Sequence, residues 1–485
     1  MSDAFEPQPR HPSLVASPPR LTALAPVRCL ALALIVGSCL GPRAARAEMA
    51  ATVNENGIPS DSIVTSLPDK GDPGGLRKWL AQRGITYTIY YTNEMLGTVS
   101  GGIRRGALYE GKLDAQFSAD LEKLAGLKGL SFYSNIFQLH GTGGPRRDFI
   151  GNLNTISNIE ALPTTRLSEL WLEQKFFNDR ASFRAGQLAV DQEFFTSDLS
   201  DMFLTSDWPP ITASDLPSGG PAYPFATPGV RLKVEPVKDL ALLLALFNGD
   251  PAGSGTGNPE ARNRYGVAFR VNDPPFLIGE AQYKYNQAAG LAGTIRLGAW
   301  HHFGSFDDKR FGTDGLSLAN PVSNGIARML RGDDGIYGVI DQQLYRPPGG
   351  DAESGIGIFS RMSASPSDRN LISFYWDGGI VFSGLIPGRP DDKFGATFVY
   401  SRISDGARAL NQDQIAFTGL PQPVRDYELT LEFTYSAQIV PGWTIQPDFQ
   451  YIFHPGGNIP DPTVPSGIVP IKDAAIIGLR SVIKY

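Results

Sequence analysis

Hydrophobic and polar residues alternate with a period of two along most of the chain beyond residue 85. In the first such segment Ile85, Tyr87, Ile89 and Tyr91 lie on one side, and Thr86, Thr88, Tyr90 and Thr92 on the other. The next segment sets Tyr109, Leu113, Ala115 and Phe117 against Glu110, Lys112, Asp114 and Gln116. This alternation predicts β-strands with one apolar and one polar face.

The apolar faces could form the core of a soluble sandwich or the lipid-facing surface of a membrane barrel. Charged residues recur on the polar faces, and segments such as 294–302, 426–437 and 444–453 approach the ~10 residues that cross a bilayer when tilted. Strands of soluble sheets average only ~5–6 residues. The pattern therefore predicts an all-β fold, a transmembrane antiparallel β-barrel.

Alternating segments number seventeen, but single-chain bacterial barrels have even strand numbers, so we expect sixteen strands. The segments begin near residues 85, 107, 130, 166, 181, 229, 240, 263, 277, 292, 336, 355, 371, 393, 426, 442 and 474. Counting from the first strand places loops 97–106, 140–165 and 191–228 outside the cell. Counting back from Tyr485 places 304–334, 405–424 and 455–472 there. The two counts conflict between 229 and 286, which locates the surplus segment.

Residues 1–47 have the organisation of a secretory signal peptide. Basic residues precede an apolar run at 29–40, and Ala45-Arg46-Ala47 follows as a cleavage site. Val36-Gly37-Ser38-Cys39 leaves a lipoprotein cleavage box open as an alternative. Residues 48–84 are expected to form a short periplasmic segment, in which a flexible polar lead precedes an amphipathic helix over 75–81. Residues 85–485 are expected to form the barrel domain.

Composition narrows the class of protein. The 54 glycines and 38 prolines among 485 residues indicate many turns, and 27 Phe with 17 Tyr are too many for a disordered chain. Both cysteines, Cys29 and Cys39, lie in the predicted signal, so a disulfide framework is not expected. Without residues 1–47 the chain has 38 basic and 47 acidic side chains, a net charge of −9 that argues against nucleic acid as a partner.

Motifs of catalysis are missing from the sequence. It has no His-Glu-x-x-His, no Gly-x-Ser-x-Gly and no phosphate-binding loop, so no catalytic residue, cofactor or metal site is expected. His301 and His302 are adjacent on a strand and point to opposite faces, which prevents chelation of one metal. An exported β-sandwich hydrolase remains an alternative.

Two regions could contact a solute. A two-residue turn at 177–180 would place Glu173 opposite Arg184. The pair could simply neutralise charge on the water-lined wall, or it could belong to a charged ladder that hydrogen-bonds a solute. The segment 191–227 carries many aromatic and acidic side chains: Phe194, Phe195, Phe203, Trp208, Tyr223 and Phe225 with Asp191, Glu193, Asp198 and Asp201. It could fold into the barrel and stack on sugars, or only cap the mouth.

The last strand sets apolar residues such as Ile477, Leu479 and Ile483 on its outward face and ends on Tyr485. A terminal aromatic of this kind resembles bacterial outer-membrane proteins, in which the barrel-insertion machinery recognises it. We therefore expect that machinery and outer-membrane lipid as partners.

Several motifs resemble the carbohydrate-selective porins of the OprB type. They include Gly101-Gly102-Ile103-Arg104-Arg105-Gly106, Ile150-Gly151-Asn152-Leu153-Asn154-Thr155, Glu169-Leu170-Trp171, Arg184-Ala185-Gly186-Gln187-Leu188, Glu193-Phe194-Phe195, and the run from Leu216 to Pro224. The match covers the chain from Gly75 and is densest at 100–250. The terminal Tyr485 and the loop 304–334 depart from the family pattern.

The resemblance implies a sixteen-strand barrel in the bacterial outer membrane, with a narrow charged eyelet that admits monosaccharides such as glucose and similar polyols by facilitated diffusion. From charge, face and aromatic character we expect the eyelet among Arg104, Arg105, Arg166, Glu169, Glu173, Arg184, Glu193, Trp208 and Tyr223. A general diffusion porin without sugar preference and a structural or adhesive barrel remain alternatives. Monomer and homo-oligomer both stay open.

Overall fold

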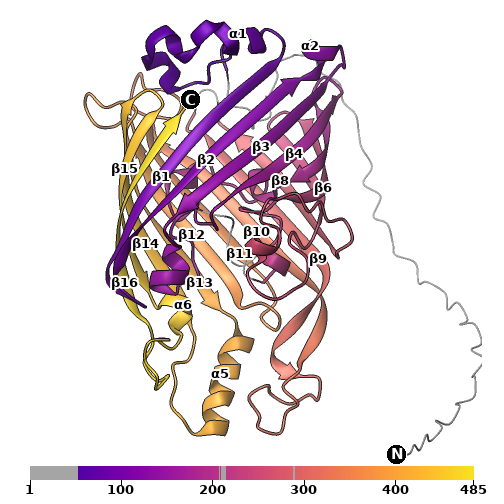
Figure 1. Cartoon of the computed structure of the whole chain (residues 1–485), viewed down its shortest axis with the longest axis vertical. Helices are drawn as coiled ribbons and strands as arrows, with labels where there is room; N and C mark the ends of the chain where they lie inside the picture. The colour runs from indigo at the N-terminus through magenta and orange to yellow at the C-terminus, as the bar shows by residue number, and fades with distance from the viewer. Residues whose placement is uncertain (1–52, 207, 209–214, 288–289) are drawn as a thin grey trace, which may run out of the picture. The chain divides into compact units, whose positions relative to one another are not determined.

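The structure, a computed structural model, describes residues 53–206, 208, 215–287 and 290–485. The predicted signal peptide at 1–47 lies outside the described residues. Within them the chain closes sixteen antiparallel strands into one barrel, in which every strand pairs with its sequence neighbours and β1 pairs with β16 (Figure 1). The predicted fold class is confirmed.

The strands are β1 Ile85–Gly102, β2 Gly106–Asp120, β3 Leu130–Gly141, β4 Thr164–Phe176, β5 Ala181–Leu188, β6 Thr227–Val237, β7 Leu240–Asn248, β8 Pro275–Tyr285, β9 Gly293–Gly312, β10 Ala327–Tyr345, β11 Gly355–Ala364, β12 Ile372–Ser383, β13 Lys393–Ile403, β14 Tyr427–Val440, β15 Trp443–Phe453 and β16 Lys472–Lys484. The helices are α1 Leu76–Ala81, α2 Leu121–Ala125, α4 Pro259–Arg262, α5 Asp405–Thr418 and α6 Pro455–Asn458. Short 3₁₀ or π turns are η1 Ile63–Ser66, η2 Pro68–Gly71, η3 Pro73–Gly75, η4 Arg146–Ile150, η5 Val190–Gln192, η6 Ser200–Met202 and η7 Pro217–Gly219.

The surplus segment is the one that begins near residue 263. Tyr265, Val267, Phe269 and Val271 alternate as in a strand, but this stretch is an irregular connection between α4 and β8 and all four side chains are exposed. Among the described residues no strand pairs with this stretch, so the alternation of its residues predicted a strand that the structure does not have. With it removed, both ways of counting place the same loops on one side of the barrel.

Strand lengths differ from the expected ~10 residues. The predicted loop 97–106 is only a three-residue connection, because β1 runs to Gly102 and β2 begins at Gly106. The predicted loop 304–334 shrinks to 313–326, because β9 and β10 have 20 and 19 residues and extend past the other strands beside α5 (Figure 1). Charged residues on these extensions hid their strand character.

The two faces of each strand meet different surroundings. On β7, Leu242, Leu244 and Leu246 are outward and 42–51% exposed. Inward residues such as Glu280 and Asp341 are buried against loops inside the barrel. An apolar exterior around a polar interior is typical of a barrel that spans a membrane. Among the described residues, no helix is long and apolar enough to cross a membrane.

The segment before β1 is folded, contrary to the expected flexible lead. Within 53–72, Ser62 and Val64 are fully buried and η1 packs beside Gly442 at the barrel end that carries the C-terminus. The short helix at 75–81 is confirmed as α1, but it turns the unexpected face inward. Arg77 is 1% exposed, whereas Leu76 and Trp79 are 56% and 50% exposed.

Candidate functional site: a constriction inside the barrel

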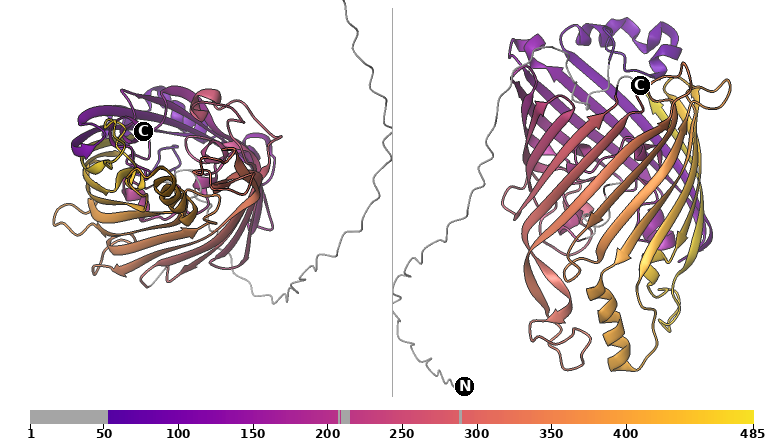
Figure 2. Two further views of the ribbon diagram at one scale, coloured as in Figure 1. Left: turned by 90° about the horizontal axis from the view of Figure 1, so that it is seen from below. Right: turned by 180° about the vertical axis from the view of Figure 1, so that it is seen from behind.

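The described parts of the connection between β5 and β6, residues 189–206, 208 and 215–226, lie in the interior of the barrel (Figure 2). Apolar side chains anchor it: Phe194, Phe195 and Trp208 are buried in one cluster with wall residues such as Phe276 and Trp300. A second cluster joins Leu204 of this connection to Ile156 of the β3–β4 connection and to Ile476 of β16. Two loops therefore fill part of the lumen.

A cavity of about 310 Å³ lies between these loops and the wall. It receives side chains from β1, β2, β11 and β16 and from both loops. The lining residues are Thr92, Lys112, Asn158, Ile159, Asp191, Gln192, Phe195, Thr196, Asp201, Ser206, Trp208, Tyr223, Arg361 and Arg480.

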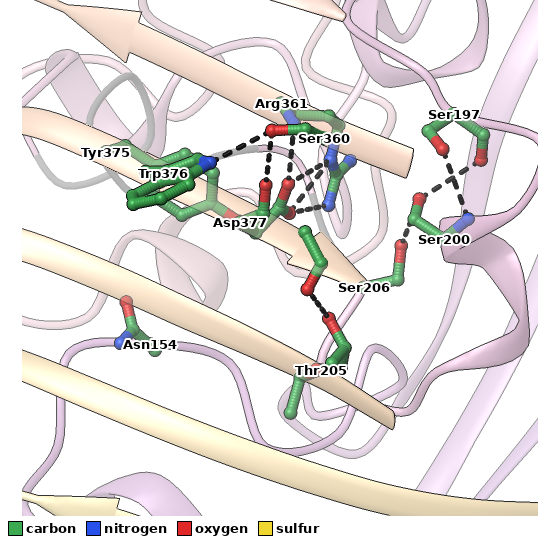
Figure 3. A network of polar contacts seen from close by, with 12 residues as sticks. Asn154, Ser197, Ser200, Thr205, Ser206, Ser360, Arg361, Tyr375, Trp376 and Asp377 are labelled. Carbon is green, nitrogen blue, oxygen red and sulfur yellow. Dashed lines mark hydrogen bonds and ion pairs between the residues drawn. The ribbon is translucent and has the colours of Figure 1, made fainter. Parts of the chain in front are cut away.

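The cations of the cavity come from the wall. Arg480 donates to Glu94 at 2.6 Å and to the side-chain oxygen of Asn158 at 2.6 Å. Arg361 donates to both carboxylate oxygens of Asp377 (Figure 3). Such bonds fix the guanidinium groups while their outer edges still face the cavity.

Lys112 is the third cation of the wall. Its ammonium lies 3.8 Å from Asp114 and about 5 Å from the ring centres of Phe137 and Tyr223. The inward β5–β6 loop supplies the opposite charge, because the carboxylates of Asp191 and Asp201 face the same cavity. Donors and acceptors of both charge signs thus surround the cavity.

Aromatic rings form a further part of the lining. Phe195 stacks on Tyr337 of β10 with ring centres 4.3 Å apart. Tyr223 donates its hydroxyl to the carbonyl of Ile159 at 2.8 Å, and its ring tilts against Phe137. Phe195 is buried by this stacking, whereas the ring of Tyr223 is partly exposed and can contact the C–H face of a sugar while neighbouring polar groups meet its hydroxyls.

Three of the predicted residues, Glu173, Arg184 and Glu193, come together in one ion-pair cluster. Arg184 donates to Glu173 at 3.3 Å and to Glu193 at 3.1 Å. The register prediction is confirmed, since Glu173 pairs with Arg184, although the turn spans four residues rather than two. The cluster joins the loop residue Glu193 to the wall, and none of its members is among the cavity-lining groups.

Sequence reasoning missed a fourth member of this cluster. Arg231 of β6 lies directly opposite Arg184 and donates to Glu173 and Glu193 at 2.8 Å each. Two like charges on paired strands are therefore bridged by two glutamates. Nothing in the sequence pairs Arg231 with Glu193, which belongs to the loop.

Arg166 and Glu169 hold loop segments against β4. Arg166 is 2% exposed, donates to the carbonyl of Asn263 and lies 4.8 Å from the ring centre of Phe225. Glu169 accepts from the backbone N–H of Ala189 at 3.2 Å, where the inward loop begins.

Arg104 and Arg105 lie apart from the cavity, exposed on the connection between β1 and β2. Arg104 donates to the carbonyl of Asp148 at 2.8 Å and stacks over Phe149. Hydrogen bonds from Arg147 lower the pKa of Asp148 to about 2. Glu160, further along the same loop, has its pKa raised to about 7 by burial.

Of the nine predicted residues, Trp208 and Tyr223 line the cavity. Lys112, Arg361 and Arg480 do so without having been predicted. Lys112 lies on a predicted polar face of its strand, but alternation gives the face of a strand and not the height at which a loop will meet it. Among the described residues no three His, Cys, Asp or Glu side chains gather where they could hold a metal ion.

Comparison with known proteins gives one family. The family model described as carbohydrate-selective porin, OprB family, matches residues 104–485. Porin B of Pseudomonas aeruginosa is 24% identical over 406 residues, which cover 80% of this chain and 87% of that protein. The putative porin QuiX of Acinetobacter baylyi is 21% identical over 439 residues, covering 84% and 91%.

Solved structures share the fold. The high-pH structure of Pseudomonas putida OprB superposes with a TM-score of 0.74 at 20% identity, covering 86% of this chain and 98% of that one. The low-pH structure of the same protein gives a TM-score of 0.52 at 18% identity, covering 86% and 97%. Both are barrels that this chain resembles along nearly their whole length.

Proposed function

Because this chain belongs to the OprB family of carbohydrate-selective porins, we propose that the cavity inside its barrel is the eyelet through which single sugars pass. The chain is a bacterial outer-membrane porin for carbohydrates. Membership in this family makes it a channel, and facilitated diffusion requires only a path with matched donors and acceptors.

One observation carries the proposal for the site. Guanidinium and ammonium donors, carboxylate acceptors and fixed aromatic rings meet around a single cavity of about 310 Å³. Each hydroxyl of a neutral polyol both donates and accepts hydrogen bonds, so donors and acceptors around the cavity can replace the water that it loses. A cavity with only one charge sign would offer only donors or only acceptors. Monosaccharides such as glucose fit this description.

The predicted site residues take different parts in this proposal. Trp208 and Tyr223 contact the sugar directly. Glu173, Arg184 and Glu193 support the loop from behind, together with Arg166 and Glu169. Arg104 and Arg105 stand at the extracellular mouth, where they meet a solute before the eyelet does.

Export and assembly complete the proposal. Residues 1–47 act as a signal peptide, 48–84 form a periplasmic segment and 85–485 the membrane domain. The outward apolar band faces lipid, and the barrel-insertion machinery engages the strand that ends at Tyr485.

A planar bilayer tests the sugar path. Glucose added to channels of the wild-type protein should reduce the ion current in a saturable manner, because a bound sugar occupies the ion path. Lys112→Met, which removes one donor of the eyelet, should raise the half-saturating glucose concentration at least about tenfold, because a hydrogen bond from a charged group contributes about 1.5 kcal/mol or more.

Lys128→Met is the matched control, since Lys128 is exposed on the connection between β2 and β3 at the far end of the barrel. It should leave the glucose response unchanged. Channels indifferent to glucose would favour a general diffusion porin, and the absence of channels would leave only a structural or adhesive barrel.

A further inference from the structure

Besides its apolar side chains, hydrogen bonds to buried carboxylates of the wall hold the inward loop in place. Glu280 of β8 accepts the N–H of Phe195 at 2.8 Å, and Asp341 of β10 accepts the hydroxyl of Ser197 at 2.5 Å. Further along, Glu432 of β14 accepts the N–H groups of Leu204 and Thr205. A chain that runs through a barrel leaves amides without strand partners, and buried donors require acceptors.

Glu432 makes the densest of these contacts. Its side chain is fully buried; one carboxylate oxygen accepts from Leu204 N–H at 2.8 Å, and the other from Thr205 N–H at 3.0 Å and the Thr205 hydroxyl at 2.6 Å. On the adjacent strand β15, the amide of Gln446 donates to the carbonyl of Met202 at 2.8 Å. The wall thus supplies an acceptor to Leu204 and Thr205 and a donor to Met202.

The clamped residues lead directly into the eyelet. Ser206 follows Thr205 and lines the cavity, and its hydroxyl donates to Ser200 at 3.0 Å (Figure 3). Trp208, two residues later, lines the same cavity. The carbonyl of Leu204 accepts from the N–H of Asn158, another lining residue, on the β3–β4 loop. A shift of the clamp would therefore move lining groups on both loops.

A carboxylate suits this task better than a neutral group. Hydrogen bonds to an ionised acceptor are stronger than those to a neutral one, and here three donors point at two oxygens. A carboxamide in the same place would set its own NH₂ against at least one of those donors, which leaves a buried donor unsatisfied.

We propose that Glu432 is the positioning residue of the eyelet: through Leu204 and Thr205 it fixes where Ser206, Trp208 and Asn158 meet the sugar. The inference rests on the proposed sugar path and adds the element that sets its affinity. Glu432 does not line the cavity, so it acts only through the residues it holds.

Glu432→Gln, measured in bilayers, is the test, with Glu428→Gln as its control. Glu428 lies on the same face of β14, is equally buried and accepts three backbone N–H groups, those of Leu153, Asn154 and Gly456, none of which lines the cavity. Glu432→Gln should raise the half-saturating glucose concentration about tenfold and leave the sugar-free conductance equal to or above that of wild type, whereas Glu428→Gln should stay within about twofold. A variant that fails to fold would form fewer channels. It would not raise the half-saturating glucose concentration of the channels that do form while leaving their sugar-free conductance unchanged.

Gln446→Leu removes the donor half of the clamp and serves if Glu432→Gln fails to form channels; it should weaken the glucose response in the same direction. The proposal is overturned if the variant that forms channels has the same half-saturating glucose concentration as the wild type. It is also overturned if Glu428→Gln raises that concentration as much as Glu432→Gln does. A wild-type channel that glucose does not block contradicts the proposed sugar path itself, and the positioning role falls with it.

Discussion

Arg184 is held on several sides at once. Its guanidinium lies 3.8 Å from the ring centre of Trp171, donates to Glu173 and Glu193, and is 3% exposed. Arg184→Ala would leave both glutamates with Arg231 alone, and breaking a buried ion pair of this kind costs about 3–5 kcal/mol. We expect the free energy of unfolding in urea, measured in lipid vesicles, to fall by that amount.

The matched exposed pair is Arg402–Asp405, whose side chains are 46% and 68% exposed. Water and salt screen such a pair, so Arg402→Ala should cost less than about 1 kcal/mol. Equal losses in the two variants would show that burial does not distinguish them. The Glu173–Arg184 pair followed from the sequence through the register, whereas Arg231 required knowledge of how the loop carries Glu193 back to the wall.

At the scale of elements, the N-terminal segment covers the seam where β1 meets β16. Arg77 lies 4.0 Å from the ring centre of Tyr87 and 4.8 Å from that of Tyr485, and it donates to the carbonyls of Gly57 and Tyr87. The hydroxyl of Tyr485 donates to the carbonyl of Gly71. The last residue of the barrel is thus packed against the chain's own leading segment.

Arg77→Leu should therefore loosen the seam. The last backbone pair, Ile89 with Tyr485, would lose its cover, and hydrogen exchange of peptides that span 480–485 should speed up several-fold, as read by mass spectrometry. Arg83→Leu is the control, because Arg83 stacks 4.0 Å from the ring centre of Trp79, which is half exposed. Equal exchange in both variants would contradict a role for Arg77 in the seam.

The elements themselves were largely predictable from the sequence. Alternation predicted all sixteen strands, because the outward face must be apolar wherever it meets lipid. It also predicted one surplus strand, which the count of loop orientations confined to 229–286 without identifying it. It failed where that constraint ends: β9 and β10 continue past the other strands with Asp307, Lys309 and Asp333 in their sequence. The helical period predicted α1 but not its orientation, because a buried arginine replaced the expected apolar face.

At the scale of the whole molecule, the site depends on contacts far apart in the sequence. Lys112 of β2, Arg361 of β11 and Asp201 of the inward loop meet around one cavity although more than 85 residues separate each from the next along the chain. Face, charge and motif can be predicted from the sequence, but the depth at which the loop crosses the lumen is set by buried contacts such as that of Glu432. Trp208 and Tyr223 were predicted correctly because the aromatic content of their loop indicated a segment that contacts a solute.

The same arrangement makes a prediction about solute charge. Glucose, gluconate and glucosamine have similar size but are neutral, anionic and cationic at neutral pH. Because the cavity presents Lys112, Arg361 and Arg480 together with Asp191 and Asp201, either charged solute meets like charge as well as opposite charge at close range. In swelling assays with porin-containing liposomes, both should therefore enter several-fold more slowly than glucose.

Raising the ionic strength should narrow the difference in entry rate without changing glucose entry, since salt screens only the charged solutes. Faster entry of gluconate or glucosamine than of glucose would contradict an eyelet built for neutral sugars.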